Sequence, residues 1–135
     1  IKMAKQLAII NKKTESILEE VWPGAITVVL KRKKQLKIFG VKNKTIALRI
    51  PDHKFIKKLL EKTNRPLIGT SVNFSGEPFS VDIRKIISHF QGKQYSPDLI
   101  IDTGRLKKSL PSTIIDLTGV RPKTLRAGEK TPQFK

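Results

Sequence analysis

The sequence predicts a single-domain α/β protein in which helices flank a twisted sheet of mixed parallel and antiparallel strands. Short apolar and β-branched runs alternate with longer segments whose apolar residues recur at helical spacing. The two kinds of segment alternate irregularly, which favours a mixed sheet over a regular parallel one. The chain of 135 residues, 38% of them hydrophobic, is long enough to bury a core. We therefore assign residues 1–135 to one domain.

Two helices and two strands are expected in the first 50 residues. Residues 2–10 combine good helix formers with spaced apolar side chains, which predicts a short helix. Thr14 can cap a second helix, which the Trp-Pro-Gly sequence at 22–24 ends. The runs at 25–30 and 45–50 are rich in β-branched residues and predict strands.

The rest of the chain predicts two more helices and further strands. Asp52 can cap the third helix and Ser80 the fourth, and each helix has an apolar stripe that we expect to face the core. The stripes comprise Phe55, Ile56, Leu59 and Leu60 in the third helix, and Ile83, Ile86, Ile87 and Phe90 in the fourth. Strands are expected at 67–68, 98–102, 113–117 and 124–126.

Composition excludes several kinds of site. The sequence has no cysteine, so it forms neither a disulfide nor a thiolate zinc site, and its two histidines, His53 and His89, lie far apart. It has no 18-residue apolar run and no charged-then-apolar leader, so we expect a cytoplasmic protein without a membrane segment. The formal net charge of +17 favours a polyanionic partner or substrate. The alternative is a lysine- and isoleucine-rich bias of the source genome.

Small polar residues follow the strand expected at 67–68. Thr70, Ser71, Asn73 and Ser75 supply hydroxyl and amide groups, and Gly69 and Gly76 let a ligand approach the backbone closely. In α/β sheets, ligands bind in the crevice beyond the carboxyl ends of strands. The segment therefore predicts a binding rim, although an ordinary turn is the alternative because these residues also favour turns locally.

Five segments, taken in order, carry a resemblance to a known family. They are Trp22-Pro23-Gly24-Ala25-Ile26-Thr27-Val28-Val29-Leu30, Ala47-Leu48-Arg49-Ile50-Pro51-Asp52-His53, the stretch from Gly69 to Pro78, Pro111-Ser112-Thr113-Ile114-Ile115-Asp116-Leu117, and Leu125-Arg126-Ala127-Gly128. The sequence resembles the YrdC-like threonylcarbamoyl-AMP synthase family from about Lys2 to Gly128, and the fold of that family agrees with the mixed sheet expected above.

The resemblance implies a function. Enzymes of this family form threonylcarbamoyl-AMP from L-threonine, bicarbonate and ATP with release of pyrophosphate, and other, tRNA-modifying proteins then pass the activated group to a tRNA adenosine. ATP would be a substrate accompanied by Mg²⁺. No nucleophile with an adjacent base is found among the matching residues, so catalysis would rest on positioning and charge neutralisation.

The resemblance also assigns site residues. Arg49, whose guanidinium can hold a carboxylate bidentately, would bind threonine together with Gly69 and Ser112. The nucleotide would be contacted by Thr45, Ser71, Asn73 and Arg126. The alternatives are a surface ion pair for Arg49 and a strand-start cap for Ser112.

The sequence departs from the family at several points. Val72 stands where alanine is common, and Phe79 stands where a small polar residue commonly contacts the nucleotide. The family's N-terminal portion, with a Pro-Thr-(Asp/Glu)-Thr-Tyr-Gly-Leu-type turn and a Lys-x-Arg segment, does not occur in these 135 residues. We therefore expect this chain alone to release little pyrophosphate, because that portion supplies phosphate-binding cations in the family.

Two other functions stay open at this stage. A basic surface, including Lys31-Arg32-Lys33-Lys34, could hold RNA without catalysis, although a solvated turn is the simpler interpretation of that cluster. A YrdC-like domain that handles carbamoyl groups, as in hydrogenase maturation proteins, would use a similar pocket. Binding of threonine and ATP would distinguish the synthase from an RNA-binding module.

Overall fold

The computed structural model describes residues 1–36, 43–74, 76–107 and 109–132. The chain divides into two compact units, of which the first comprises Ile1–Leu67 and Leu110–Lys135, and the second comprises Ile68–Ser109. Ser75, expected at the binding rim, lies outside the described residues.

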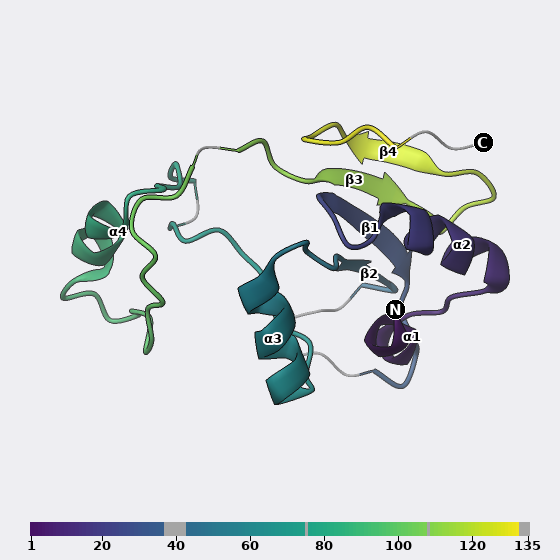
Figure 1. The fold of residues 1–135 in the computed structure, drawn as a ribbon, viewed down its shortest axis with the longest axis horizontal. Helices are drawn as coiled ribbons and strands as arrows, with labels where there is room; N and C mark the ends of the chain where they lie inside the picture. The colour runs from purple at the N-terminus through teal and green to yellow at the C-terminus, as the bar shows by residue number, and fades with distance from the viewer. Residues whose placement is uncertain (37–42, 75, 108, 133–135) are drawn as a thin grey trace. The chain divides into compact units, whose positions relative to one another are not determined.

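Four strands form one mixed sheet in the first unit, in the order β2-β1-β3-β4 (Figure 1). Their bounds are Ile26–Lys31 for β1, Thr45–Leu48 for β2, Thr113–Asp116 for β3 and Lys123–Arg126 for β4. β1 pairs antiparallel with β2 and parallel with β3, and β3 pairs antiparallel with β4. The predicted mixed α/β sheet is therefore confirmed.

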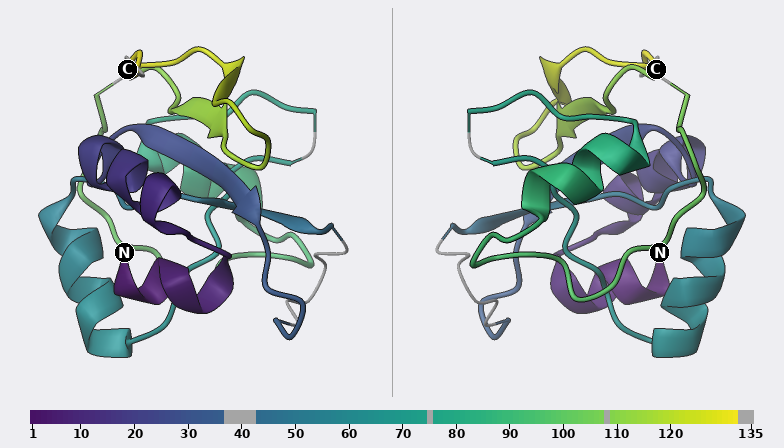
Figure 2. Two further views of the ribbon diagram at one scale, coloured as in Figure 1. Left: turned by 90° about the vertical axis from the view of Figure 1, so that its right-hand side faces the viewer. Right: turned by 90° about the vertical axis from the view of Figure 1, so that its left-hand side faces the viewer.

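Two helices, α1 (Lys2–Leu7) and α2 (Lys12–Val21), pack on one face of this sheet (Figure 1, Figure 2). The buried apolar residues are Ala4, Ala8, Leu18, Trp22, Ile26, Val28, Leu30 and Ile115. Alternate residues of β1 contribute to this core, so Thr27 and Val29 fall on the opposite face of the sheet. That opposite face is called the second face below.

A buried hydrogen bond fixes the entry into β1. The Trp22 indole Nε1 donates to the Ile26 carbonyl at 2.8 Å, and the peptide between Trp22 and Pro23 is cis. As predicted, α2 ends before this turn, which returns the chain to the sheet.

Three helices begin at caps other than those predicted. In α2, the Asn11 side chain accepts from the Thr14 amide at 2.8 Å, so Thr14 is the capped residue and not the cap. His53 rather than Asp52 caps α3 (Lys54–Thr63), and Asp82 rather than Ser80 caps α4 (Ile83–Phe90). Cap-forming residues stand close together in these segments, and the side chain that reaches a free amide of the first turn sets the boundary.

Two predicted strands and two predicted core stripes are wrong. Residues 67–68 and 98–102 form no strand, and Leu67 and Ile68 are 51% and 83% exposed. Neither α3 nor α4 has a buried residue, although both helices form. An apolar pattern requires a partner surface for burial, and a strand requires a neighbour for its backbone hydrogen bonds. Among the described residues the two segments have no paired strand, and the two helix stripes are at most partly covered.

The second unit is built around a small aromatic cluster at α4. The Phe74 ring centroid lies 4.7 Å from that of His89 and 5.1 Å from that of Phe90. His89 Nε2 also lies 3.1 Å from a Glu77 carboxylate oxygen. These contacts join the turn after Asn73 to the last turn of α4.

No helix among the described residues is long and apolar enough to cross a membrane.

Candidate functional site

Strand register and alternation set two of the predicted arginines on the second face. Thr27 pairs with Ile114, and Ile114 pairs with Arg126. Arg49 follows Leu48, the last paired residue of β2, which pairs with Val28 and faces the core. Three strand spacings of about 4.8 Å separate β2 from β4 by roughly 14 Å. Two long cationic side chains therefore stand at opposite edges of the same sheet face.

Arg126 is held against the start of β3. Its Nε and Nη2 donate to the Ser112 carbonyl at 3.2 and 2.7 Å, and Nη2 also lies 3.3 Å from Ser112 Oγ. Ser112 Oγ in turn lies 2.8 Å from Thr27 Oγ1. Thr27, Ser112 and Arg126 are called the hydroxyl–arginine cluster below. The cluster leaves the Arg126 Nη1 group without a protein partner among the described residues, so this guanidinium can be fixed in place and still donate to an anion.

Gly128 explains why the chain returns so closely after Arg126. A Cβ on Gly128 would lie 2.2 Å from the Pro111 carbonyl oxygen and 2.6 Å from backbone atoms of Ser112 and Thr113. The Gly128 amide donates to Thr113 Oγ1 at 3.0 Å, and the Glu129 amide donates to the Pro111 carbonyl at 3.0 Å. Only glycine permits this approach, which presses the end of β4 onto the segment that carries Ser112.

Arg49 follows β2 and is exposed, whereas Thr45 begins β2 and is partly buried. The Gly24 amide donates to the Ile50 carbonyl at 2.8 Å and holds the Arg49 segment beside the start of β1. Arg49 has no ion-pair partner within the described residues, so the alternative of a surface ion pair has no support there. Ser112 Oγ contacts the side chains of Thr27 in β1 and Arg126 in β4, and no backbone amide of the described residues donates to it.

Gly69, Ser71 and Asn73 belong to the second unit. Gly69 and Ser71 are exposed. The Asn73 amide nitrogen donates to the Phe74 and Glu77 carbonyls at 3.1 and 2.6 Å, while its Oδ1 is buried and has no partner in the described part of the chain. The convergence of these three residues with Arg49, Ser112 and Arg126 on one cleft stays a prediction.

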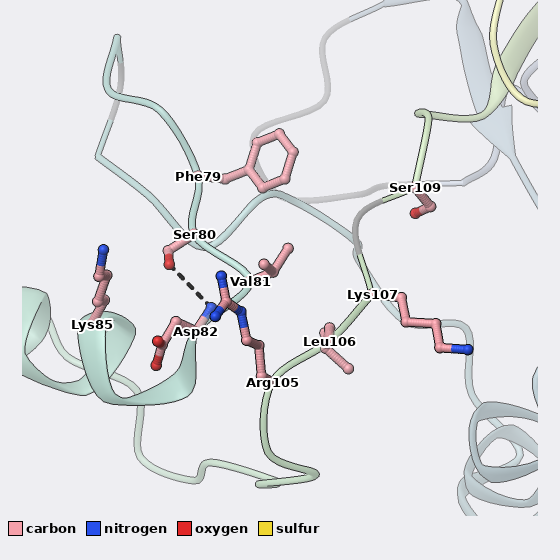
Figure 3. A pocket seen from close by; sticks show the side chains of 9 residues that line it. All are labelled: Phe79, Ser80, Val81, Asp82, Lys85, Arg105, Leu106, Lys107 and Ser109. Carbon is pink, nitrogen blue, oxygen red and sulfur yellow. Dashed lines mark hydrogen bonds between the residues drawn. The ribbon is translucent and has the colours of Figure 1, made fainter.

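A cavity of about 670 Å³ lies within the second unit. It is lined by Phe79, Ser80, Val81, Asp82, Lys85, Arg105, Leu106, Lys107 and Ser109. Figure 3 shows Arg105 extending toward the turn of Ser80 and Asp82, whereas Lys85 and Lys107 extend away to opposite sides. Ser80 Oγ accepts from the Asp82 amide at 3.1 Å, and Asp82 in turn caps α4. The three cations are therefore not gathered around one point, as a phosphate site would require.

Sequence reasoning missed Thr27. It lies in the Trp22–Leu30 segment that carries the family resemblance, where the pattern of β-branched residues predicts only a strand. The signal was available, because strand alternation sets a threonine at 27 on the face opposite the buried residues at 26 and 28. The contact of Thr27 with a residue 85 positions later was not predictable from local pattern.

The described residues contain no group of three or more histidine, aspartate or glutamate side chains that could hold a metal ion. The site is instead a sheet face with hydroxyls and two arginines. Fold and site together define a mixed-sheet α/β protein with a surface suited to an anionic ligand.

Comparison with known proteins identifies the family. The Sua5/YciO/YrdC family model, described as "Telomere recombination", matches residues 1–128, and the chain belongs to this family. The threonylcarbamoyl-AMP synthase of Pyrococcus abyssi is 33% identical over 120 residues, which are 88% of this chain and 34% of that protein. The threonylcarbamoyl-AMP synthase of Mus musculus is 32% identical over 109 residues, covering 76% of this chain and 38% of that protein.

Solved structures agree with this assignment. The crystal structure of Pyrococcus abyssi Sua5 complexed with L-threonine matches with a TM-score of 0.79 and 34% identity, over 95% of this chain and 37% of that one. Escherichia coli YciO matches with a TM-score of 0.79 and 28% identity, over 94% of this chain and 61% of that one. The chain thus spans 34% and 38% of the two synthases and 61% of YciO.

Proposed function

We propose that this chain provides the threonine- and nucleotide-binding sheet face of a threonylcarbamoyl-AMP synthase. The reaction would join L-threonine, bicarbonate and ATP into threonylcarbamoyl-adenylate and release pyrophosphate. The product would supply the tRNA-modifying proteins that form threonylcarbamoyladenosine. The observation that carries the proposal is the placement of Arg49, Thr27 and Arg126 on one face, with Ser112 bonded between two of them.

The geometry of this face supports a division of roles. Arg49 is exposed at one edge and can hold the threonine carboxylate with two parallel hydrogen bonds. Arg126 is fixed at the other edge by the Ser112 carbonyl and can present its remaining donors to a phosphate. The spacing of roughly 14 Å between β2 and β4 leaves room for two ligands side by side. Ser112 would then contact threonine between them.

The second unit carries Gly69, Ser71 and Asn73, which the resemblance assigns to ligand contacts. The buried Asn73 Oδ1 without a partner in the described residues is suited to accept a hydrogen bond from a ligand donor. The exposed Ser71 hydroxyl can contact a ligand, and a ligand can approach the backbone of Gly69 closely because glycine has no side chain. Phe79 is 65% exposed, so its ring is available for stacking where a small polar residue is common in the family.

Mg²⁺ would enter with the nucleotide. The described residues lack a cluster of metal ligands, which fits an ion held largely by substrate phosphates and water. Bound in this way, Mg²⁺ would neutralise phosphate charge, and the residues of this chain would hold the reactants in the orientation that the reaction requires.

Isothermal titration calorimetry with L-threonine and ATP, each alone and then together, tests the proposal. We expect saturable binding of each and tighter binding of one in the presence of the other. L-Serine and GTP are the matched control ligands, and each should bind more weakly. Absence of binding by both L-threonine and ATP would overturn the proposal.

An RNA-binding module is the competing function, because the net charge of +17 attracts polyanions. A titration with short RNA across a range of salt concentrations separates the two. Tight RNA binding that falls steeply with salt, without binding of threonine or ATP, would favour the module.

A further inference from the structure

The hydroxyl of Thr27 lies within hydrogen-bonding distance of a predicted ligand-binding hydroxyl. Thr27 Oγ1 and Ser112 Oγ are 2.8 Å apart and partly buried, and either atom can be the donor. Thr27 belongs to the central strand β1, which is paired on both sides, whereas Ser112 lies in the segment just before β3. A side chain on a rigid central strand therefore contacts one in a loop.

Hydrogen-bond counting limits how this pair can be arranged. A hydroxyl has one proton to donate and two lone pairs with which to accept. Arg126 can only donate, so its Nη2, at 3.3 Å, occupies one lone pair of Ser112 Oγ. One lone pair and one proton of Ser112 then remain for Thr27 and for a ligand.

The two arrangements of the pair differ in what Ser112 offers a ligand. If Ser112 donates to Thr27, it keeps only a lone pair and cannot bind an ionised oxygen. If Thr27 donates to Ser112, both lone pairs of Ser112 are filled and its proton is directed outward. Ionised carboxylate and phosphate oxygens only accept hydrogen bonds, so an anion at Ser112 selects the second arrangement.

We infer that Thr27 is a positioning residue that holds the Ser112 hydroxyl as an outward donor to an anionic ligand oxygen. The inference rests on the proposed function for the identity of the ligand, which would be the carboxylate of L-threonine. Thr27 itself touches Ser112 and not the substrate. Its effect should therefore appear in threonine binding and much less in ATP binding.

Three variants test the inference. Thr27→Val keeps the shape of the side chain and removes the hydroxyl, while Thr27→Ser restores it. Thr124→Val is the matched control, because Thr124 is an exposed threonine in β4 of the same sheet. Calorimetric titration of each full chain gives its affinity for L-threonine and for ATP.

We expect Thr27→Val to weaken L-threonine binding about two- to tenfold, the effect of losing one hydrogen bond. ATP binding should change less than twofold, Thr27→Ser should return threonine affinity to within about twofold of wild type, and Thr124→Val should leave both affinities unchanged. Equal loss for both ligands, or no rescue by Thr27→Ser, would show that Thr27 has only a structural role and would overturn the inference.

A second measurement separates this inference from the proposed function. NMR couplings between Hα and Hβ of Ser112 report whether its side chain keeps one rotamer, whatever ligand the protein binds. We expect one rotamer in wild type and Thr27→Ser, and averaged couplings in Thr27→Val. Failure of the wild type to bind threonine would overturn the ligand assignment, and an unchanged Ser112 rotamer in Thr27→Val would overturn the positioning role.

Discussion

Gly128→Ala should destabilise the first unit strongly, because the added methyl group has no space. Its Cβ would lie 2.2 Å from the Pro111 carbonyl oxygen and 2.6 Å from two further backbone atoms. Real Cβ atoms essentially never approach within 3.0 Å, so the backbone of β4 or of the Pro111–Thr113 segment must shift. A flexible side chain could yield, but the three nearest atoms are all backbone.

The magnitude follows from two contributions. Overpacking of this kind costs about 1–3 kcal/mol. The shift also stretches two hydrogen bonds, from the Gly128 amide to Thr113 Oγ1 and from the Glu129 amide to the Pro111 carbonyl, each contributing about 0.5–1.5 kcal/mol. We expect a loss of about 2–4 kcal/mol in the free energy of unfolding, a large part of the total for a domain of this size.

Urea unfolding measures this loss. Trp22 is the single tryptophan and is buried in the first unit, so its fluorescence reports the unfolding of that unit. Gly119→Ala is the matched control, because it lies in the loop between β3 and β4 and its Cβ would meet only an ordinary contact at 3.8 Å. If Gly128→Ala unfolds within about 0.5 kcal/mol of wild type, the close approach inferred from the structure is wrong.

Three further predictions follow from the same structure. Arg49→Lys should weaken L-threonine binding by about 1–3 kcal/mol with unchanged urea unfolding, because a point charge replaces a bidentate fork; unchanged affinity in calorimetry would remove Arg49 from the site. Leu18→Ala should lower the free energy of unfolding by about 2–5 kcal/mol because Leu18 is fully buried, whereas Val120→Ala, at a residue of the same unit that is 91% exposed, should change it by less than about 0.5 kcal/mol; equal effects in urea unfolding would contradict the assigned core. Asn11→Ala should lower the free energy of unfolding by about 1 kcal/mol, and Thr14→Ala should lower it much less, because the Asn11 side chain caps α2. A larger loss for Thr14→Ala than for Asn11→Ala in urea unfolding would identify Thr14 as the cap.

The parts of the fold that could be predicted are those governed by local pattern. Local sequence predicted the strand β1, along which buried and less buried residues alternate, and the end of α2 at the Trp-Pro-Gly turn. Both predictions were possible because strand geometry and proline act over a few residues. The predicted helix starts were less accurate. Asn11, His53 and Asp82 each cap a helix, and each has a nearby residue that could also have served as the cap. The predictions of strands at 67–68 and 98–102 were wrong, because a strand forms only where a neighbouring strand can pair with it, and the sequence of the segment does not show whether one is present.

The candidate site was predictable only through the resemblance. Spacing alone gave no reason to join Ser112 to Arg126, yet the antiparallel pairing of β3 with β4 brings them within hydrogen-bonding distance. Thr27 was missed because its partner lies 85 residues away in the sequence. The need for glycine at Gly128, in the Leu125-Arg126-Ala127-Gly128 segment, is explained only by the structure, in which the backbone of Pro111 lies against it.

A ¹⁵N NMR titration of this chain with L-threonine tests directly whether the second face of the sheet binds the ligand. We expect saturable shifts in the amides of Thr27, Arg49 and Arg126 on the second face, and in the amide of Ser112, whose hydroxyl lies 2.8 Å from that of Thr27. Amides of Ala4 in α1 and Leu18 in α2, on the opposite face, should stay unchanged. Shifts centred on those helices, or none at all when L-threonine is in excess, would contradict the assignment of the second face as the ligand-binding site.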